Sequence, residues 1–563
     1  MKKILIILMV LVFGSLSAQE YDNEDEGTNE SIVNFSGNLL VTSSLYSNGG
    51  VGSQRESPYS YAITGSPVLT IYKLSIPMTF SYADQKFNYS YSFSTYGASP
   101  RYKWAQLHLG YRSMNFSSFT LDGRQFLGSG IELRPGKFYF GALYGRLDNR
   151  FARKYKIGIE VSDIETYKRS MYGFKIGYGE NSRIDFVALK VKDDPASSEP
   201  KEGDNTELVP KDNVVLGLNF NTDLFDKLSV RMESAASLMT NDARSTVEVD
   251  STDEYYSLYS RVNKIIKTNI STRWGYIFSM NSRLRLNLFN IGFTYKRVTS
   301  DFNSLGVYYI LTDFEDYTAN LSFSLFKRQV HFNLRGGFNR NNLSLVRRAT
   351  NLRRIGSIQA NYASSNGFNI SFNYSNIQSD QKAGYMELDD TLRLVLVNQN
   401  LAVNSGYNWG NKNISHSVNL NFNASSMTNI NDKYFMPVGE SDNKNINLSY
   451  NLRHKPTNMR YKCSFNYFVL NSDDYTSTGL GVDLGANRKL LKDKLTVGLN
   501  TSFTQRTANG ENDGLHFKLR NNIGYNITKN QKLNFYFSWS KRPSISKRPL
   551  NEMRANFTYN LNF

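Results

Sequence analysis

The last stretch of the chain reads Met553-Arg554-Ala555-Asn556-Phe557-Thr558-Tyr559-Asn560-Leu561-Asn562-Phe563. Every second side chain is apolar or aromatic, and the positions between them carry Arg, Asn or Thr. Because successive side chains of a strand point to opposite faces, this pattern predicts a strand with one apolar and one polar face. Such a strand needs lipid or a protein core on one side only. It therefore fits a membrane barrel or the last strand of a soluble sandwich.

A chain that ends on such a strand resembles the C-terminal signal of bacterial outer-membrane barrels, in which alternating aromatic residues finish in Phe. The resemblance implies that the barrel assembly machinery is a partner. It also implies that the assembly signal consists of Phe557, Tyr559, Leu561 and Phe563.

The N-terminus has the three regions of a secretory signal peptide: basic Met1-Lys2-Lys3, an apolar run from Ile4 to Phe13, and small residues up to Ala18. We expect a signal peptide over residues 1–18 and a short acidic periplasmic lead over residues 19–30. The one cysteine, Cys463, cannot form a disulfide within the chain, and the cysteine count excludes cysteine-based metal clusters.

Composition separates a barrel from a helical membrane protein. After the signal no run approaches the roughly 20 apolar residues of a spanning helix, and the mean hydropathy is −0.46. A barrel still spans a bilayer at such a value, because only alternate residues of its strands meet lipid. The 37 Tyr and 36 Phe residues suit strands and the interfacial belts of a membrane protein.

Two-residue alternation recurs through the second half of the chain, for example over residues 368–374, 418–424, 495–503 and 533–539. The polar face of these strands is mostly Asn, Ser, Thr and Gly, so a second sheet cannot pack there as in a sandwich. A polar or water-filled lumen can face it. His416, in one of these strands, is expected to face the lumen.

Connector lengths alternate between short and long when read backward from Phe563. Arg506 to Asp513 and Met427 to Lys444 are predicted to be long, whereas Asn471 to Asp474 is short where a long connector is expected. Short periplasmic turns and longer outer loops are typical of outer-membrane barrels. The sequence therefore predicts an all-β fold: one large antiparallel transmembrane β-barrel over residues 31–563, with about 22 to 26 strands in even number and both termini periplasmic.

A segment over residues 114–130 breaks the regular strand pattern with several Phe and Gly residues. A barrel this wide cannot fill its lumen with strand side chains, so it holds a plug, infolded loops, a partner or water. An ordinary loop is slightly favoured here, and a segment that folds inward as a plug or constriction is the alternative. The candidate constriction or plug residues are Phe116, Phe119, Arg124 and Phe126.

Charge gives weaker indications. The formal net charge is +17, and a basic cluster around residues 327–354 is a candidate for lipopolysaccharide phosphates or an anion-favouring lumen; scattered charges balanced elsewhere are the alternative. The contact candidates are Arg347, Arg348, Arg353 and Arg354. The acidic segment from Asp193 to Asn213 lacks calcium-loop spacing, so we expect a solvated outer loop. Nucleic acid is not expected as a partner.

No enzyme motif surrounds the five His residues, so we expect no catalytic site, no metal and no cofactor. Energised transporters carry a plug domain of over a hundred residues before their first strand. Here strands are predicted from about Ser31, which disfavours active uptake.

Three stretches, Ser99 to Trp104, His108 to Arg112 and Gly123 to Leu133, resemble uncharacterised outer-membrane barrel proteins of Bacteroidota. This resemblance implies a barrel fold and an outer-membrane location, and it supplies no catalytic residues. It also implies partners in secretion, gliding or glycan-uptake machines. The sequence thus predicts a non-enzymatic, porin-like channel in contact with outer-membrane lipids and lipopolysaccharide. A structural or accessory subunit of an envelope complex, with other envelope proteins as partners, is the alternative.

Overall fold

A computed structural model describes residues 33–49, 56–83, 95–147, 167–197, 209–383, 393–430, 439–542 and 550–563. The predicted signal peptide and acidic lead lie outside these residues, as does most of the acidic segment after Asp193.

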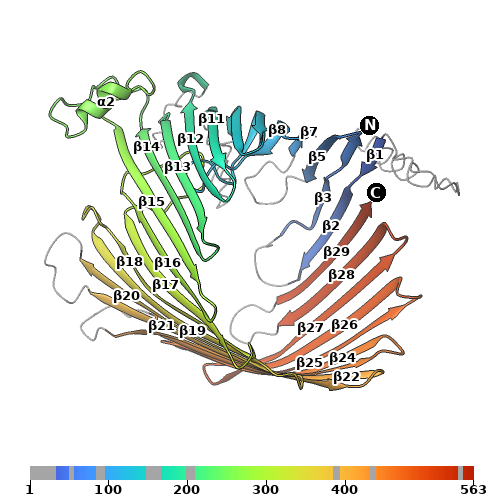
Figure 1. Cartoon of the computed structure of the whole chain (residues 1–563). Helices are drawn as coiled ribbons and strands as arrows, with labels where there is room; N and C mark the ends of the chain where they lie inside the picture. Colours follow the sequence, from blue (N-terminus) through green and yellow to red (C-terminus); the bar gives the residue numbers. More distant parts are fainter. Residues whose placement is uncertain are drawn as a thin grey trace.

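The strands form one closed antiparallel barrel (Figure 1). Strands adjacent in the sequence pair with one another. The circle closes where β29 (Leu550–Asn562) pairs with β2 (Asn38–Asn48). The described residues contain 29 strand segments, but β1 with β2, β3 with β4, and β6 with β7 are each one interrupted strand, so the wall has 26 strands. The predicted large, even-stranded, antiparallel barrel is confirmed.

The strand bounds follow the chain in order. Long strands, of up to 17 residues, concentrate in the second half. The strands are β1 (Val33–Ser36), β2, β3 (Tyr59–Gly65), β4 (Val68–Ile71), β5 (Leu74–Ala83), β6 (Thr95–Ala98), β7 (Arg101–Tyr102), β8 (Ala105–Ser113), β9 (Gln125–Leu133), β10 (Phe138–Leu147), β11 (Arg169–Gly179), β12 (Ser182–Asp193), β13 (Asp212–Leu224), β14 (Leu228–Thr240), β15 (Thr272–Arg285), β16 (Phe289–Val298), β17 (Phe314–Leu325), β18 (Val330–Asn341), β19 (Ala349–Ala363), β20 (Phe368–Ala383), β21 (Leu394–Gly410), β22 (Ile414–Asn429), β23 (Ser441–His454), β24 (Met459–Ser472), β25 (Tyr475–Leu490), β26 (Leu495–Ala508), β27 (Glu511–Asn526), β28 (Gln531–Arg542) and β29. A short 3₁₀ helix (Pro195–Ser197) and α2 (Tyr256–Val262) lie between strands.

The seam between the first and last strands depends on Gly37, which separates β1 from β2. The Gly37 amide donates to the Phe563 carbonyl (2.7 Å), and the Phe563 amide donates back to Gly37 (3.0 Å). A Cβ at Gly37 would lie 2.6 Å from the Cα of Pro67, so only glycine allows this approach. The ring of Phe563 stacks on Phe35 with centroids 4.9 Å apart.

The outer face of the wall carries two rows of aromatic residues separated along the strands. In β16, Phe289 stands beside Phe323 (5.8 Å between centroids), and Tyr295 stands beside Tyr317 (4.7 Å). These two rows are six residues apart, about 20 Å along a strand. Two aromatic girdles flanking an apolar band are the outer surface of a transmembrane barrel.

His416 belongs to this outer face, and the expectation that it faces the lumen is wrong. It shares its parity with Val418, Leu420 and Phe422. Its ring stacks on Trp409 (5.1 Å), and its Nδ1 lies 2.7 Å from the Tyr450 hydroxyl.

Connections alternate between two rims, named here by the chain ends. The terminal rim holds the first described strand residues, the C-terminal Phe563 and tight turns, such as Phe225–Lys227 between β13 and β14. The distal rim holds the long connections, including residues 241–271 with α2. One predicted long connector, Arg506 to Asp513, is wrong: β26 and β27 continue to a tight turn at Asn509–Gly510, because both residues adopt the positive φ (50° and 80°) that such hairpins require.

Candidate functional site: a lumen of two halves

The loop between β8 and β9 (residues 114–124) folds into the barrel. Its side chains meet the inner face of the wall: a Cβ at Gly173 would lie 2.8 Å from the Phe116 ring, and one at Gly217 would lie 2.9 Å from Thr120. Phe116 is 2% exposed and Phe126, which begins the return strand, is 0% exposed. The inward-folded part is therefore residues 114–124, whereas residues 125–130 belong to β9.

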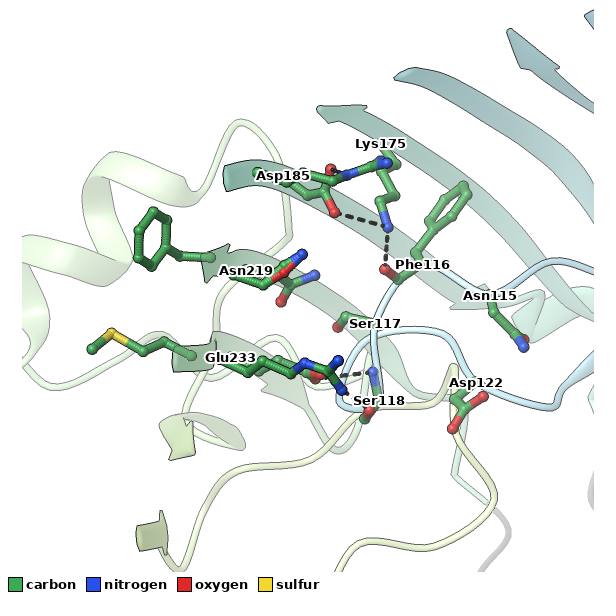
Figure 2. A pocket seen from close by; sticks show the side chains of 14 residues that line it. Asn115, Phe116, Ser117, Ser118, Asp122, Lys175, Asp185, Asn219 and Glu233 are labelled. Atoms are coloured by element: carbon green, nitrogen blue, oxygen red, sulfur yellow. Dashed lines mark hydrogen bonds and ion pairs between the residues drawn. The ribbon is translucent and has the colours of Figure 1, made fainter. Parts of the chain in front are cut away.

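Charged side chains of the wall hold the backbone of this loop (Figure 2). The Lys175 ammonium donates to the Phe116 carbonyl (2.7 Å) and pairs with Asp185 (3.3 Å). The Ser118 amide donates to the Glu233 carboxylate (3.3 Å). A polar cavity of about 370 Å³ lies between this loop and the wall.

A second infolded loop joins β16 to β17 (residues 299–313). Its Ser304 hydroxyl donates to the Thr120 carbonyl (2.9 Å) of the first loop. Gly306 lies so close that a Cβ there would overlap the Thr120 carbonyl oxygen. Arg124 of the first loop stacks on Tyr308 of the second, with its guanidinium 4.6 Å from the ring centroid. The two loops are therefore one unit.

Asn213 of β13 fastens the second loop to the wall. It is 0% exposed. Its side-chain oxygen accepts from the Leu305 amide (3.0 Å), and its side-chain nitrogen donates to the Asn303 carbonyl (3.3 Å) and the Ser237 hydroxyl (3.0 Å). No feature of the sequence was assigned to this loop. Its apolar residues Phe302 and Leu305, which lie in a connection between two strands, are the signal that could have marked it.

Both loops pack against apolar inner side chains to form a core inside the barrel. We call the wall from β8 to β17, with these two loops, the infolded half. The predicted residues Phe116, Phe119 and Phe126 all belong to this core. Its members are Met114, Phe116, Phe119, Leu121, Phe126, Leu143, Leu147, Met171, Val187, Leu189, Val191, Val215, Ala235, Met239, Ile277, Val298, Phe302, Leu305 and Phe314.

The wall from β18 to β29, here called the polar half, has a different inner face. A row of side chains crosses four strands: Asn421 donates to Asn447 (3.2 Å), Asn447 donates to Asn466, and Asn466 donates to Asp483 (2.6 Å). Many neighbouring inner side chains, such as Asn423, remain exposed. Solvent therefore reaches the parts of this inner face that no described residue covers.

Inner charges also differ between the halves. In the infolded half they are largely paired, as Arg169 with Asp193 (2.6 Å) and Arg183 with Asp185 (2.7 Å). At the inward strand positions of the described polar half, the acidic residues are Asp483, Glu511 and Glu552. The basic residues at those positions are Arg335, Arg353, Arg453, Arg460, Lys462, Lys489, Arg506, Lys518, Arg520, Lys532, Arg542 and Arg554.

One row of side chains has the elements of an acyl-transfer site. Ser99 lies 3.0 Å from His108 Nδ1, and His108 Nε2 lies 3.6 Å from Glu132, which also binds Arg134 (2.6 Å). Ser99 and His108 are 6% and 7% exposed, so a substrate cannot reach the hydroxyl in this conformation. The row ties β8 and β9 to the preceding strand.

The predicted lipopolysaccharide contacts do not form one group. Arg347 pairs with Asp313 (3.4 Å) of the second infolded loop, and Arg348 lies exposed in the same β18–β19 connection. Arg353 and Arg354 are adjacent on β19, so Arg353 faces the lumen and Arg354 faces outward with Phe338. Contact with lipopolysaccharide stays a prediction.

The predicted assembly-signal residues share the outward face of β29, with Phe557 44% exposed and Leu561 buried. Their role in assembly stays a prediction, as does the role of Phe116, Phe119, Arg124 and Phe126 as a constriction or plug.

Beyond the wall, burial raises the pKa of the Tyr259 phenol in α2. Within the described ranges, no helix has the length and apolar character needed to cross a bilayer. The same residues contain no group of three or more His, Cys, Asp or Glu side chains placed to hold a metal ion.

The closed wall, the lipid-type outer band and the aromatic girdles define a large β-barrel of the outer-membrane type. No protein-family model and no curated protein matches the sequence. The P pilus usher (PapC) translocation pore is similar with a TM-score of 0.43 at 11% identity, over 94% of this chain and 99% of the usher chain.

Two further solved structures are similar over part of this chain. OccK5 of Pseudomonas aeruginosa has a TM-score of 0.31 at 11% identity, over 63% of this chain and 93% of its own. OmpT, an outer membrane protein of Vibrio cholerae, has a TM-score of 0.27 at 10% identity, over 68% of this chain and 98% of its own. Likeness at these TM-scores carries no argument about function.

Proposed function

We propose that this protein is an outer-membrane channel for small polar solutes. The observation that carries the proposal is the division of the lumen. Two latched loops fill the infolded half, whereas the polar half presents exposed Asn, Ser and cationic side chains along its strands. Water and solutes pass along the polar half, and residues 114–124 and 299–313 narrow the lumen.

The location in the outer membrane rests on the barrel and on the sequence. The signal-peptide pattern of residues 1–18 directs the chain out of the cytoplasm, and the terminal strand directs it to the assembly machinery. The terminal rim is then periplasmic, because short turns lie on that side in outer-membrane barrels. The resemblance to Bacteroidota barrels agrees with this assignment.

Conductance in planar bilayers tests the channel. Purified full-length protein should give stepwise conductance. Replacing residues 115–122 with a short Gly-Ser linker should raise the step size, because it removes one of the two filling loops. Silent bilayers from correctly folded, heat-modifiable barrel would contradict the proposal.

A subunit role in an envelope complex is the second candidate, and the distal rim favours it. Apolar side chains stand exposed there on three separate connections: Ile265 (65%), Tyr309 (79%) and Val346 (77%). Exposed apolar groups outside the lipid band are typical of protein contact sites. Co-purification of a stable partner that is lost in I265S/Y309S/V346S protein, together with silent bilayers, would replace the channel by this role.

The proposal includes no enzymatic step. The Ser99–His108–Glu132 row is the arrangement that an enzyme would use, and S99A should leave conductance and barrel stability near wild type.

A further inference from the structure

Cationic side chains gather on the inner face of β26 to β29. Among the described residues, no infolded loop covers this part of the wall. Strand register puts Arg520, Ser538 and Arg554 in one row across three strands. The next row toward the distal rim has Lys518, Ser540 and Glu552. Adjacent strands are about 4.8 Å apart, so Arg520 and Arg554 start about 10 Å from each other.

Acidic residues neutralise only part of this cluster. Arg554 pairs with Glu56 (2.5 Å) and lies 3.8 Å from Glu552. Lys518, Arg520 and Arg542 make no ion pair with any described carboxylate. The nearby Asp513 pairs with His516 (3.3 Å).

The basic residues are close enough to act together. The positive charges of Arg520, Arg542 and Arg554 all act on Lys518, and the negative charge of Glu552 opposes them. Arg506, on the next strand, bonds the Ser477 hydroxyl (3.1 Å) and lies over the Phe468 ring (5.3 Å), which fixes its direction toward the lumen. Arg520 and Arg542 are exposed.

We infer that the polar half selects small anions, and that Arg506, Lys518, Arg520 and Arg542 form the site that attracts them. Guanidinium groups bind carboxylates and phosphates through paired hydrogen bonds, and ammonium groups bind them as point charges. A cleft lined by one sign of charge concentrates the opposite ion. The solute class is therefore small carboxylates and phosphates. This inference rests on the proposed channel function and adds its selectivity.

Reversal potentials in a KCl gradient test the inference with chloride as the probe. Wild-type protein should pass chloride over potassium by about fivefold in low salt, where screening of the lumen charges is weak. K518Q/R520Q/R542Q protein, verified as a folded, heat-modifiable barrel, should lose most of this preference. Inorganic phosphate should block chloride current in wild type and block it several-fold less in the triple variant.

The matched control removes three cations from the outer face of neighbouring strands. Lys444, Arg488 and Lys541 point away from the lumen by register, so K444Q/R488Q/K541Q changes net charge equally. It should keep wild-type selectivity.

The outcomes separate the two proposals. Conductance without anion preference, or equal loss in both triple variants, overturns the selectivity inference alone. Silent bilayers from heat-modifiable wild-type barrel overturn the channel and this inference together.

Discussion

The infolded half and the polar half share one wall but differ in what their inner faces carry. From β8 to β17, inner positions hold residues such as Leu143, Met171 and Val187, which are nearly or fully buried. From β18 to β29, inner positions hold mainly Asn, Ser, Gly and basic residues. Apolar inner faces favour burial by loops, because leaving them in water costs free energy. The composition of the inner face therefore decides which part of a wide barrel is filled.

The longest strands lie in the polar half. Strands of the infolded half are 9 to 14 residues long, whereas β21 in the polar half has 17. About 9 to 11 tilted residues cross a bilayer, so β21 extends beyond it. The infolded half instead returns its chain into the lumen at two of its described connections.

The largest expected effect is the loss of the entire barrel, both halves together, from the membrane. Replacing Phe557, Tyr559 and Phe563 together with Ser should abolish membrane insertion, because the seam loses its aromatic contacts and the assembly signal is absent. Cell fractionation and heat-dependent gel mobility measure this. T558S, on the inward face of the same strand, is the control and should insert normally. Heat-modifiable triple variant in the outer membrane would contradict the prediction.

Next in size is a change to the core of the infolded half. F126A should lower the free energy of unfolding by about 3–5 kcal/mol, as removal of a fully buried ring usually does. N423A, at an exposed inner position of the polar half, should stay within about 0.5 kcal/mol of wild type. Denaturant unfolding in detergent micelles measures both. Equal losses would mean that the two halves are equally packed.

Loosening the second loop should change conductance more than stability. N213A leaves the Leu305 amide and the Asn303 carbonyl without a side-chain partner, at a cost of about 1–3 kcal/mol. We expect larger or noisier conductance steps, because residues 299–313 are no longer held against the wall. N219A, on the same face of β13, has no such contacts and is the control. Unchanged steps in N213A would show that this loop does not narrow the pore.

The smallest expected effect concerns lipid phosphate at the outer face. R354Q should weaken lipopolysaccharide binding by about 0.2–1 kcal/mol, as expected for an exposed charge contact. R353Q is the control, because Arg353 is next to Arg354 in the sequence but faces the lumen. Thermal shift in the presence of added lipopolysaccharide measures the difference, and equal shifts would remove Arg354 from the contact.

Much of the wall could be predicted from the sequence, because strand alternation is local. The strands around residues 368–374 and 533–539 lie where their alternation placed them, and the even-numbered barrel followed. Prediction was weaker near the N-terminus, where β3 (Tyr59–Gly65) was missed among short, interrupted strands.

Only the first of the two infolded loops of the candidate site could be predicted from the sequence. Phe116, Phe119 and Phe126 stood out because aromatic residues interrupted a strand pattern, but nothing local paired them with residues 299–313. The error at His416 arose from a misassigned parity. Arg353 and Arg354 were grouped by proximity in sequence, although a strand separates neighbouring side chains onto opposite faces.

By itself, the sequence determined the strands, their two faces and the closing of a large barrel, because alternation with period two is written residue by residue. Tertiary structure alone decided that Ser304 meets Thr120, that Asn213 holds the second loop, and that Arg506, Lys518, Arg520 and Arg542 share one region of the lumen. These contacts join distant parts of the chain. Their positions follow from the register of the closed wall, which no local pattern specifies.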